Sequence, residues 1–225
     1  MKQITVLLAD DHAIVRQGLR LLVEADSNIE IVAEAKTGRE AVRLTDKLRP
    51  EIVVMDVAMP LLNGVEATRQ ILKSFPTTKV LILSAHSDLE YVEQVLKAGA
   101  RGYLVKQSSG DVLTKAIHEL HRGKTYFASS IAKRLQECFQ KSEDGVGLQL
   151  KNDYQLTSRE TELLQLIAEG HANKQVASEL GISIKTVEKH RQHLMKKLNI
   201  HDIAGLTRFA IAEGIIESSV HSTVA

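Results

Sequence analysis

Five polar residues in the first half of the chain stand where apolar runs end, and their types suit phosphoryl transfer. Asp10 and Asp11 follow the first of these runs, and Asp56 ends the third. Ser84 and Lys106 lie at the ends of the fourth and fifth runs. A carboxylate can accept a phosphoryl group covalently, which makes Asp56 a candidate nucleophile. A lysine and a hydroxyl that face it would stabilise the charge of the transferring group.

The acidic residues also predict a site for a divalent cation. If the strands that precede Asp10, Asp11 and Asp56 are adjacent in a parallel sheet, the three carboxylates converge, repel and raise one another's pKa. Mg2+ relieves this repulsion, because it prefers oxygen ligands and keeps several of its waters. His12 and His86 flank the site without a partner at metal-ligand spacing, so neither is predicted to bind a metal.

The elements that must position these residues follow from an alternation of apolar runs and helical patterns. The apolar runs lie at 4–9, 29–35, 51–56, 79–85 and 102–106, and the helical patterns at 12–25, 38–48, 64–74, 88–98 and 109–122. Short runs rich in Val and Ile that alternate with helices predict a parallel sheet covered on both faces. We therefore expect an α/β domain over 1–125 with a five-stranded, doubly wound, flavodoxin-like sheet. Ligands of such sheets bind at the carboxyl ends of the strands.

The pattern changes after this domain. Residues 126–153 are predicted to be a linker that includes a helix over 128–140, because polar residues and two glycines follow that helix. Residues 154–218 read as helical throughout and predict a second, smaller all-α domain.

The second domain carries the marks of a helix-turn-helix. Thr157 and Glu160 match a capping box at the start of its first helix. Ala177 is small enough for a close helix crossing, and Gly181 fits a turn that needs a left-handed backbone. Apolar residues at the core positions around them complete the helix-turn-helix pattern.

One face of the second helix of this motif is predicted to contact DNA. A helical projection at about 100° per residue puts a polar and basic stripe opposite the apolar side of Val187 and Leu194. Lysines suit phosphates, while amides and carboxylates can read base edges. The candidate DNA-contacting residues are Lys185, Thr186, Glu188, Lys189, Gln192, His193 and Lys196.

Several motifs of the chain are shared with a known family. They are LLADD (7–11), VVMDVAMP (53–60), NGVEA (63–67), LSAH (83–86) and AGARGYLVK (98–106) in the first half. With them, residues 1–125 resemble the receiver domain of bacterial two-component response regulators. LTSRETELLQLIAEG, NKQVASELGIS and KTVEKHRQHLMKKL make residues 156–217 similar to the DNA-binding domain of LuxR-type regulators.

The resemblance implies roles for individual residues. It implies phosphorylation at Asp56, with Ser84 and Lys106 binding the phosphoryl oxygens. It also implies that Tyr103 is the switch aromatic, which repacks inward. The implied Mg2+ ligands are Asp10, Asp11, Asp56 and the backbone carbonyl of Ala58.

The two halves together resemble a NarL/FixJ-family response regulator, which implies a phosphorylation-dependent, DNA-binding transcription regulator and not an enzyme. The implied partners are double-stranded DNA, a cognate histidine kinase and, after phosphorylation, a second copy of the chain; RNA polymerase is a further candidate. The last helix, near 202–214, is implied as the dimer contact through Ile203, Leu206 and Ala210. Phosphorylation either frees the DNA-binding domain or promotes dimerisation, and both alternatives stay open.

Two other functions fit parts of the pattern. A phosphatase of the haloacid dehalogenase type also uses an aspartyl nucleophile, but it needs a second acid two residues later, where this chain has Ala58. A phosphorylation-independent transcription factor would keep the first domain as a structural dimerisation module. Missing pocket residues would favour that alternative, and none of the family's residue types is missing here.

Composition adds an expectation about location. The net charge is +1, so bulk electrostatics predict no particular partner. The one cysteine, Cys138, suits a reducing compartment. The apolar stretch near the N-terminus is too short for a signal peptide or a membrane span. We therefore expect a cytoplasmic protein without membrane contact.

Overall fold

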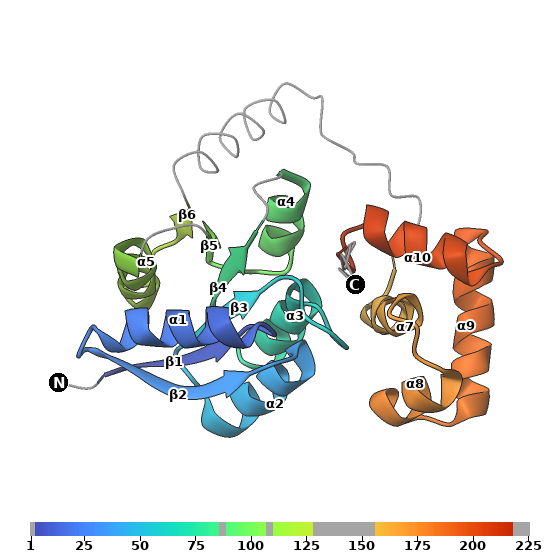
Figure 1. Cartoon of the computed structure of the whole chain (residues 1–225), viewed down its shortest axis with the longest axis horizontal. Coiled ribbons are helices and arrows are strands. Elements are labelled where there is room, and N and C mark those ends of the chain that lie inside the picture. Colours follow the sequence, from blue (N-terminus) through green and yellow to red (C-terminus); the bar gives the residue numbers. More distant parts are fainter. Residues whose placement is uncertain (1–2, 86–88, 107–109, 128–155, 218–225) are drawn as a thin grey trace, which may run out of the picture. The chain divides into compact units, whose positions relative to one another are not determined.

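The computed structural model describes residues 3–85, 89–106, 110–127 and 156–217. Contacts between residues divide the chain into two compact units, residues 1–152 and residues 153–225 (Figure 1). The helix predicted over 128–140 and Cys138 lie outside the described residues.

The first unit is built on a parallel sheet with six strands in the described part of the chain. The strands are β1 (Ile4–Ala9), β2 (Ile29–Ala35), β3 (Ile52–Asp56), β4 (Lys79–Ser84), β5 (Gly102–Val105) and β6 (Tyr126–Phe127). Their order across the sheet is β2-β1-β3-β4-β5-β6, and every pair is parallel. The predicted parallel α/β fold is confirmed, and β1 and β3 are neighbours, as the acidic residues require.

The sixth strand corrects the predicted number of five. Tyr126 pairs with Gly102, and Phe127 pairs with Tyr103. The sequence pattern assigns residues 126 and 127 to the linker, because two residues are too few to show the alternation that marks a strand. The sheet therefore continues past α5 (Gly110–His121).

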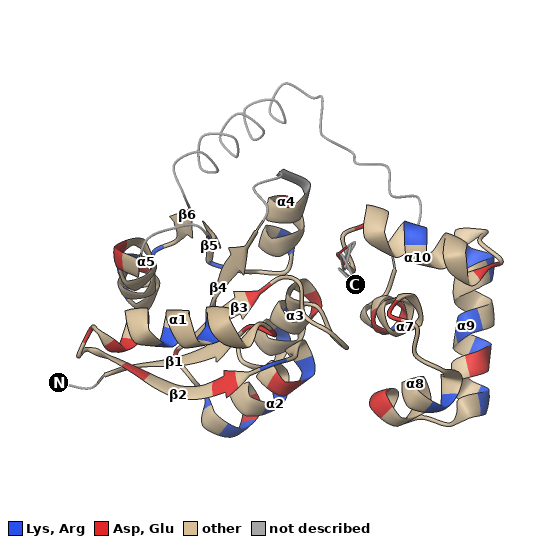
Figure 2. Ribbon diagram, in the orientation of Figure 1, with Lys and Arg blue, Asp and Glu red and all other residues tan. Residues whose placement is uncertain are grey.

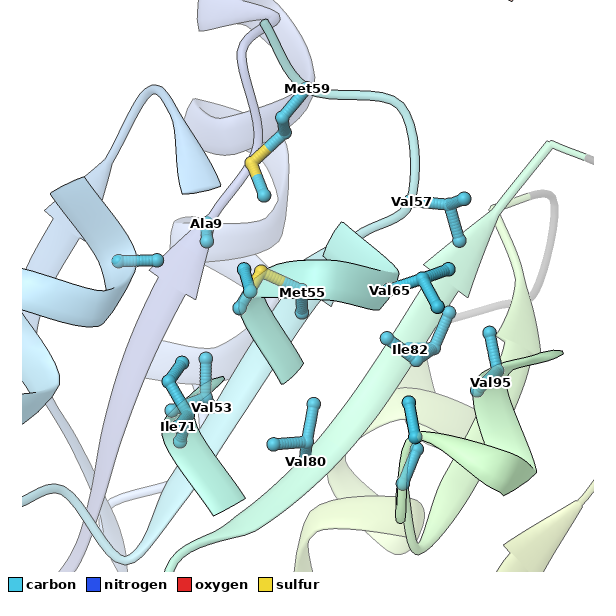
Figure 3. Close-up of a cluster of buried hydrophobic side chains, with 14 of the residues drawn as sticks. Ala9, Val53, Met55, Val57, Met59, Val65, Ile71, Val80, Ile82 and Val95 are labelled. Carbon is cyan, nitrogen blue, oxygen red and sulfur yellow. The ribbon is translucent and has the colours of Figure 1, made fainter. Parts of the chain in front are cut away.

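Helices cover both faces of the sheet (Figure 1). They are α1 (Ala13–Glu24), α2 (Gly38–Leu48), α3 (Gly64–Ser74), α4 (Leu89–Lys97) and α5 (Gly110–His121). Because side chains alternate along a strand, Val6 and Leu8 of β1 join one apolar cluster with α1 and α5. Leu7 and Ala9 join the other cluster, with α2, α3 and α4, which Figure 3 shows. Burial on both faces explains why β3 begins with the unbroken apolar run Ile52–Met55, whereas β2, at the edge of the sheet, contains Glu30 and Glu34.

The second unit is a four-helix assembly in the described residues. Its helices are α7 (Ser158–Ala168), α8 (Asn173–Leu180), α9 (Ile184–Leu198) and α10 (Ile203–Ala212). The predicted capping box is confirmed at α7: the Thr157 side chain accepts from the Glu160 N–H, and the Glu160 carboxylate accepts from the Thr157 N–H. Gly181 ends α8 with φ +63°, which confirms the predicted left-handed turn between α8 and α9.

Among the described residues, no helix combines the length and the apolar character that crossing a lipid bilayer requires.

Candidate functional site

The ends of β1 and β3 bring Asp10 and Asp56 together at one edge of the sheet. Ala9 pairs with Met55 in the register of these strands, so the next residue of each stands level with the other. Asp10 is 1% exposed and Asp56 is 3% exposed. One ligand atom from each of Asp10, Asp11, His12 and Asp56 lies within 4.8 Å of all the others. We call Asp10, Asp11 and Asp56 the acidic cluster, and clusters of this kind are typical of metal binding.

Lys106 reaches the acidic cluster from the end of β5. Its Nζ donates a hydrogen bond to Asp56 Oδ2 at 2.7 Å and lies 3.0 Å from Asp10 Oδ2. Its backbone N–H donates to the carbonyl of Ser84 at 2.8 Å, which ties the ends of β4 and β5 together. Ser84 is 1% exposed. The structure thus gathers the acidic cluster, Ser84 and Lys106 at the carboxyl edge of the sheet.

The charges of this pocket oppose one another. Burial raises the pKa of Asp56 from its ordinary value of 3.8 to about 6, because the effect of Lys106, which lowers it, is the smaller one. Asp10 and Asp11 raise the Asp56 pKa further. Burial by itself lowers the pKa of Lys106, but the negative charges of Asp56 and Asp10 outweigh it and raise that pKa overall. A second positive charge in the pocket would therefore stabilise the ionised form of Asp56.

The donor set fits a hard divalent cation. Asp10 Oδ2 is buried and forms an ion pair with Lys106 Nζ at 3.0 Å. Asp10 and Asp56 share this one ammonium, so the three carboxylates keep a net negative charge that a hard divalent cation would offset. His12, which the sequence places beside the site, has Nδ1 2.7 Å from Asp11 Oδ1 and so lies against the acidic cluster. The His12 side chain is 65% exposed, and Mg2+ prefers oxygen, so the carboxylates remain the better ligands.

The two remaining predicted pocket residues lie close by. Tyr103, on β5, is fully buried in the apolar cluster on the α2, α3 and α4 side of the sheet. Its ring occupies an inward position, and its role as the switch aromatic stays a prediction. Ala58 follows β3 and is half-buried in the turn that the Gly64 N–H closes on the Val57 carbonyl at 2.8 Å.

Gly64 shapes this turn in a way that only the structure reveals. A Cβ on Gly64 would lie 1.9 Å from the backbone oxygen of Asp56, so no larger residue fits without moving the chain at the pocket. The preceding Asn63 begins α3 by accepting a hydrogen bond from the Glu66 N–H at 2.8 Å. In the sequence, the Asn63-Gly64 pair within the motif at 63–67 is what indicates both the start of a helix and a close approach of the backbone.

Gly64→Ala is expected to lower the free energy of unfolding by about 3 kcal/mol, because the new methyl group meets backbone atoms. Gly18→Ala is the matched control. Gly18 lies inside α1, and a Cβ there meets nothing within 4 Å. The same substitution should therefore stabilise the protein by about 0.5–1 kcal/mol. Urea denaturation measures both effects, and equal effects of the two substitutions would contradict the steric argument.

The raised Asp56 pKa predicts a pH-dependent stability of the metal-free protein. Between about pH 4 and pH 6 the folded state keeps a proton that the unfolded chain has lost, so the free energy of unfolding falls as the pH rises through this window. Asp56→Asn has no ionisable group at this position and so lacks this pH dependence. The free energy of unfolding of the variant, relative to that of the unchanged protein, should therefore rise by about 1–3 kcal/mol from pH 4 to pH 6. Denaturation of both proteins in chelator at several pH values measures the difference. A constant difference would show that Asp56 ionises normally.

The helix α9 has the two faces that the sequence predicts. Val187, Leu194 and Leu198 are buried in the unit. Lys185, Glu188, Lys189, Gln192, His193 and Lys196 are exposed, and Thr186 is half-buried. Figure 2 shows the charged residues along this helix. We call the seven residues of the exposed side the α9 stripe, and its contact with DNA stays a prediction.

Contacts outside the stripe hold α9 in place. Lys197 Nζ donates to Glu160 Oε2 of α7 at 2.7 Å, and Arg191 Nη1 donates to Asn173 Oδ1 of α8 at 3.1 Å. Ser183 begins the helix by accepting a hydrogen bond from the Thr186 N–H at 3.1 Å. Lys197 and Arg191 thus hold α9 against neighbouring helices, whereas the lysines of the α9 stripe are exposed to solvent.

The structure separates the three residues predicted on α10 as the dimer contact, and that contact stays a prediction. Leu206 and Ala210 are fully buried within their own unit and present no surface to a second copy. Ile203 is 51% exposed, and Ile211 is 37% exposed. The exposed apolar side of α10 is therefore formed by Ile203 and Ile211, while the buried side packs on α7.

Both halves of the chain match known families. Residues 6–118 match the response regulator receiver domain, and residues 154–210 match the bacterial regulatory proteins of the luxR family. The oxygen regulatory protein NreC of Staphylococcus epidermidis is 38% identical over 215 residues, which cover 94% of this chain and 99% of that protein.

Solved structures give the same result. A LuxR-family two-component response regulator from Aurantimonas sp. is 36% identical with a TM-score of 0.58, over 60% of this chain and 97% of that one. A structure of two RcsB dimers bound to two parallel DNAs is 25% identical with a TM-score of 0.57, over 92% of this chain and 98% of that one.

The chain belongs to the NarL/FixJ-type response regulators, the DNA-binding output proteins of two-component systems. Its receiver half has the full acidic cluster, and its second half is a luxR-family helix-turn-helix domain. The relatives that match it over most of its length are transcription regulators.

Proposed function

We propose that phosphorylation of Asp56 controls the binding of this regulator to double-stranded DNA. The observation that carries this proposal is the buried arrangement in which Lys106 Nζ lies 2.7 Å from Asp56 Oδ2 and 3.0 Å from Asp10 Oδ2. A nucleophilic carboxylate beside a fixed ammonium and two further carboxylates is suited to accept a phosphoryl group.

In the proposed reaction an Asp56 carboxylate oxygen attacks the phosphorus of a phosphohistidine on a cognate histidine kinase. A P–O bond forms, the P–N bond breaks, and the imidazole leaves with the electron pair. Lys106 stabilises the phosphoryl oxygens by charge, and Ser84 donates a hydrogen bond to one of them. Asp10, Asp11, Asp56 and the carbonyl of Ala58 would hold Mg2+, which supplies positive charge to the transferring group.

The proposed output is a symmetric homodimer on DNA. The α9 stripe of each copy would enter the major groove of one half-site, and the two half-sites would be related by the dimer axis. Moving the population from mostly inactive to mostly active takes about 5.5 kcal/mol of differential stabilisation. We propose that the acyl phosphate supplies part of it through Ser84 and Lys106. A cytoplasmic location, and RNA polymerase as a further partner at the promoter, complete the proposal.

The test compares the affinity for genomic DNA fragments, selected by binding, with and without beryllofluoride and Mg2+. Beryllofluoride mimics the phosphoryl group on a carboxylate, so we expect affinity to rise at least tenfold in the unchanged protein. Asp56→Asn should show no change, because its amide has no anionic oxygen to which beryllofluoride can bind. Equal affinities in all conditions would favour a regulator whose receiver domain is structural.

The phosphatase alternative is tested separately. Because Ala58 stands where such enzymes have their second acid, we expect no sustained release of phosphate from generic phosphoesters. Multiple turnovers that Asp56→Asn abolishes would establish that activity instead.

A further inference from the structure

Arg16 is a buried arginine of α1 whose guanidinium reaches the backbone that carries the acidic cluster. Arg16 as a whole is 7% exposed to solvent. Nη1 donates to the backbone oxygen of Asp10 at 2.7 Å, and Nε donates to Glu34 Oε2 of β2 at 2.9 Å. A buried guanidinium is costly unless its donors are used, so these two contacts specify where the group lies.

The contact with the Asp10 carbonyl constrains both carboxylates of the DD pair. The C=O of Asp10 and the N–H of Asp11 belong to one planar peptide unit. A hydrogen bond that holds this carbonyl therefore restricts ψ of Asp10 and φ of Asp11, and with them the directions in which the two side chains leave the backbone. The N–H of Asp10 is also held, by the Ala35 carbonyl at 3.1 Å.

The Asp11 side chain depends most on this constraint. It is 32% exposed, whereas Asp10 is enclosed and its Oδ1 accepts the His12 N–H at 2.8 Å. A half-open carboxylate on a peptide that can rotate has several orientations, and only some of them meet the other carboxylates. The hydrogen bond from Arg16 restricts the rotation of this peptide, while the His12 ring contacts the Asp11 carboxylate itself, with Nδ1 2.7 Å from Oδ1.

We propose that Arg16 is a positioning residue for the divalent-cation site, and that Glu34 holds its guanidinium in place. The inference rests on the proposed function of the acidic cluster and adds a residue that touches neither cation nor phosphoryl group. Partners of this kind typically change metal affinity 10- to 100-fold when they are removed, because they orient the ligands.

The planar guanidinium group of an arginine, with its several N–H donors, is required for this positioning role. A guanidinium presents donors in two directions at once, and here they serve a carbonyl and a carboxylate on different elements. A lysine carries its charge at one point and cannot replace both contacts in the same geometry. Arg16→Lys therefore keeps the charge but should lose the positioning.

Arg20 provides a matched control on the same helix. Its Nη1 donates to the other oxygen of Glu34, Oε1, at 2.7 Å, and its side chain is 48% exposed. Its second partner is Glu24, at 2.8 Å from Nε. Arg20→Gln removes a cation and a Glu34 contact from α1 but leaves the Asp10 carbonyl bonded to Arg16.

The experiment measures Mg2+ binding to the unphosphorylated full chain by calorimetry, together with the melting temperature in chelator. We expect Arg16→Gln and Arg16→Lys to raise the Mg2+ Kd at least tenfold, and Glu34→Gln to raise it about threefold or more. Arg20→Gln should stay within twofold of the unchanged protein. A merely structural ion pair would lower the melting temperature of these variants without changing the Mg2+ Kd.

The outcomes separate this inference from the proposed function. If the unchanged protein binds Mg2+ and both Arg16→Lys and Glu34→Gln bind it equally well, the positioning role is wrong while the cation site stands. If the unchanged protein does not bind Mg2+, the proposed cation site is wrong, and the inference is overturned with it. Arg16→Lys and Glu34→Gln decide the matter even if Arg16→Gln does not fold.

Discussion

Asp56→Asn is expected to abolish the uptake of a phosphoryl group from acetyl phosphate and Mg2+. The asparagine keeps the size of the side chain but has no anionic oxygen that can attack phosphorus. In the unchanged protein Asp56 is 3% exposed, and Lys106 and the other carboxylates surround it. Intact-mass spectrometry should show the mass of one added phosphoryl group in the unchanged protein and none in the variant.

A second aspartate serves as the control for this result. Asp26 lies in the turn before β2, where its Oδ2 is 2.6 Å from His118 Nε2, away from the acidic cluster. Asp26→Asn should therefore take up the phosphoryl group as the unchanged protein does. A mass gain that persists in Asp56→Asn would place the acceptor elsewhere and remove the basis of the proposed function.

Lys106→Ala separates two parts of the mechanism. Loss of the ammonium removes the cation that contacts Asp56 but leaves the nucleophile, so we expect slow phosphorylation in place of none. It should also remove most of the increase in DNA affinity that beryllofluoride causes, because the phosphoryl group then lacks its fixed partner.

The parts of the fold that the sequence predicts are those with a repeating signal. The five apolar runs became β1 to β5. The signal is strongest at β3, where every residue is buried, and weaker at the edge strand β2, which contains Glu30 and Glu34. The pocket followed from this, since parallel strands end at one edge and Asp10, Asp56 and Lys106 stand at strand ends. No such signal marks β6, whose two residues join the sheet through pairing with β5.

Contacts between distant elements explain what the sequence does not predict. Arg16 is one basic residue in a helix with several polar positions, and nothing in its neighbours indicates that it reaches the Asp10 carbonyl. In α10, Leu206 and Ala210 are apolar residues of an amphipathic helix, and periodicity alone cannot say whether α7 or a second copy covers them. The burial of both side chains decides for α7.

Lys189→Ala and Lys196→Ala are each expected to weaken specific DNA binding by about 1–1.5 kcal/mol, roughly tenfold in Kd. Both lysines are exposed on α9, on the side opposite the buried Val187 and Leu194. Each should neutralise a phosphate and release its condensed counterions. The slope of log K against log salt should therefore become shallower by about 0.9 for each lost contact. Fluorescence anisotropy at several salt concentrations measures both the affinity and the slope.

The salt dependence distinguishes a direct contact from an indirect effect on the fold. Lys47→Ala, on the exposed end of α2 in the receiver half, removes the same charge and should change neither affinity nor slope. Lys197→Ala should instead lower stability, because Lys197 ties α9 to Glu160 of α7 at 2.7 Å. Lys197→Ala would weaken DNA binding by displacing α9. Its slope of log K against log salt should therefore stay close to that of the unchanged protein. If the two stripe variants bind normally at every salt concentration while Lys174→Ala on α8 does not, the DNA-contacting surface lies on α8 and not on the α9 stripe.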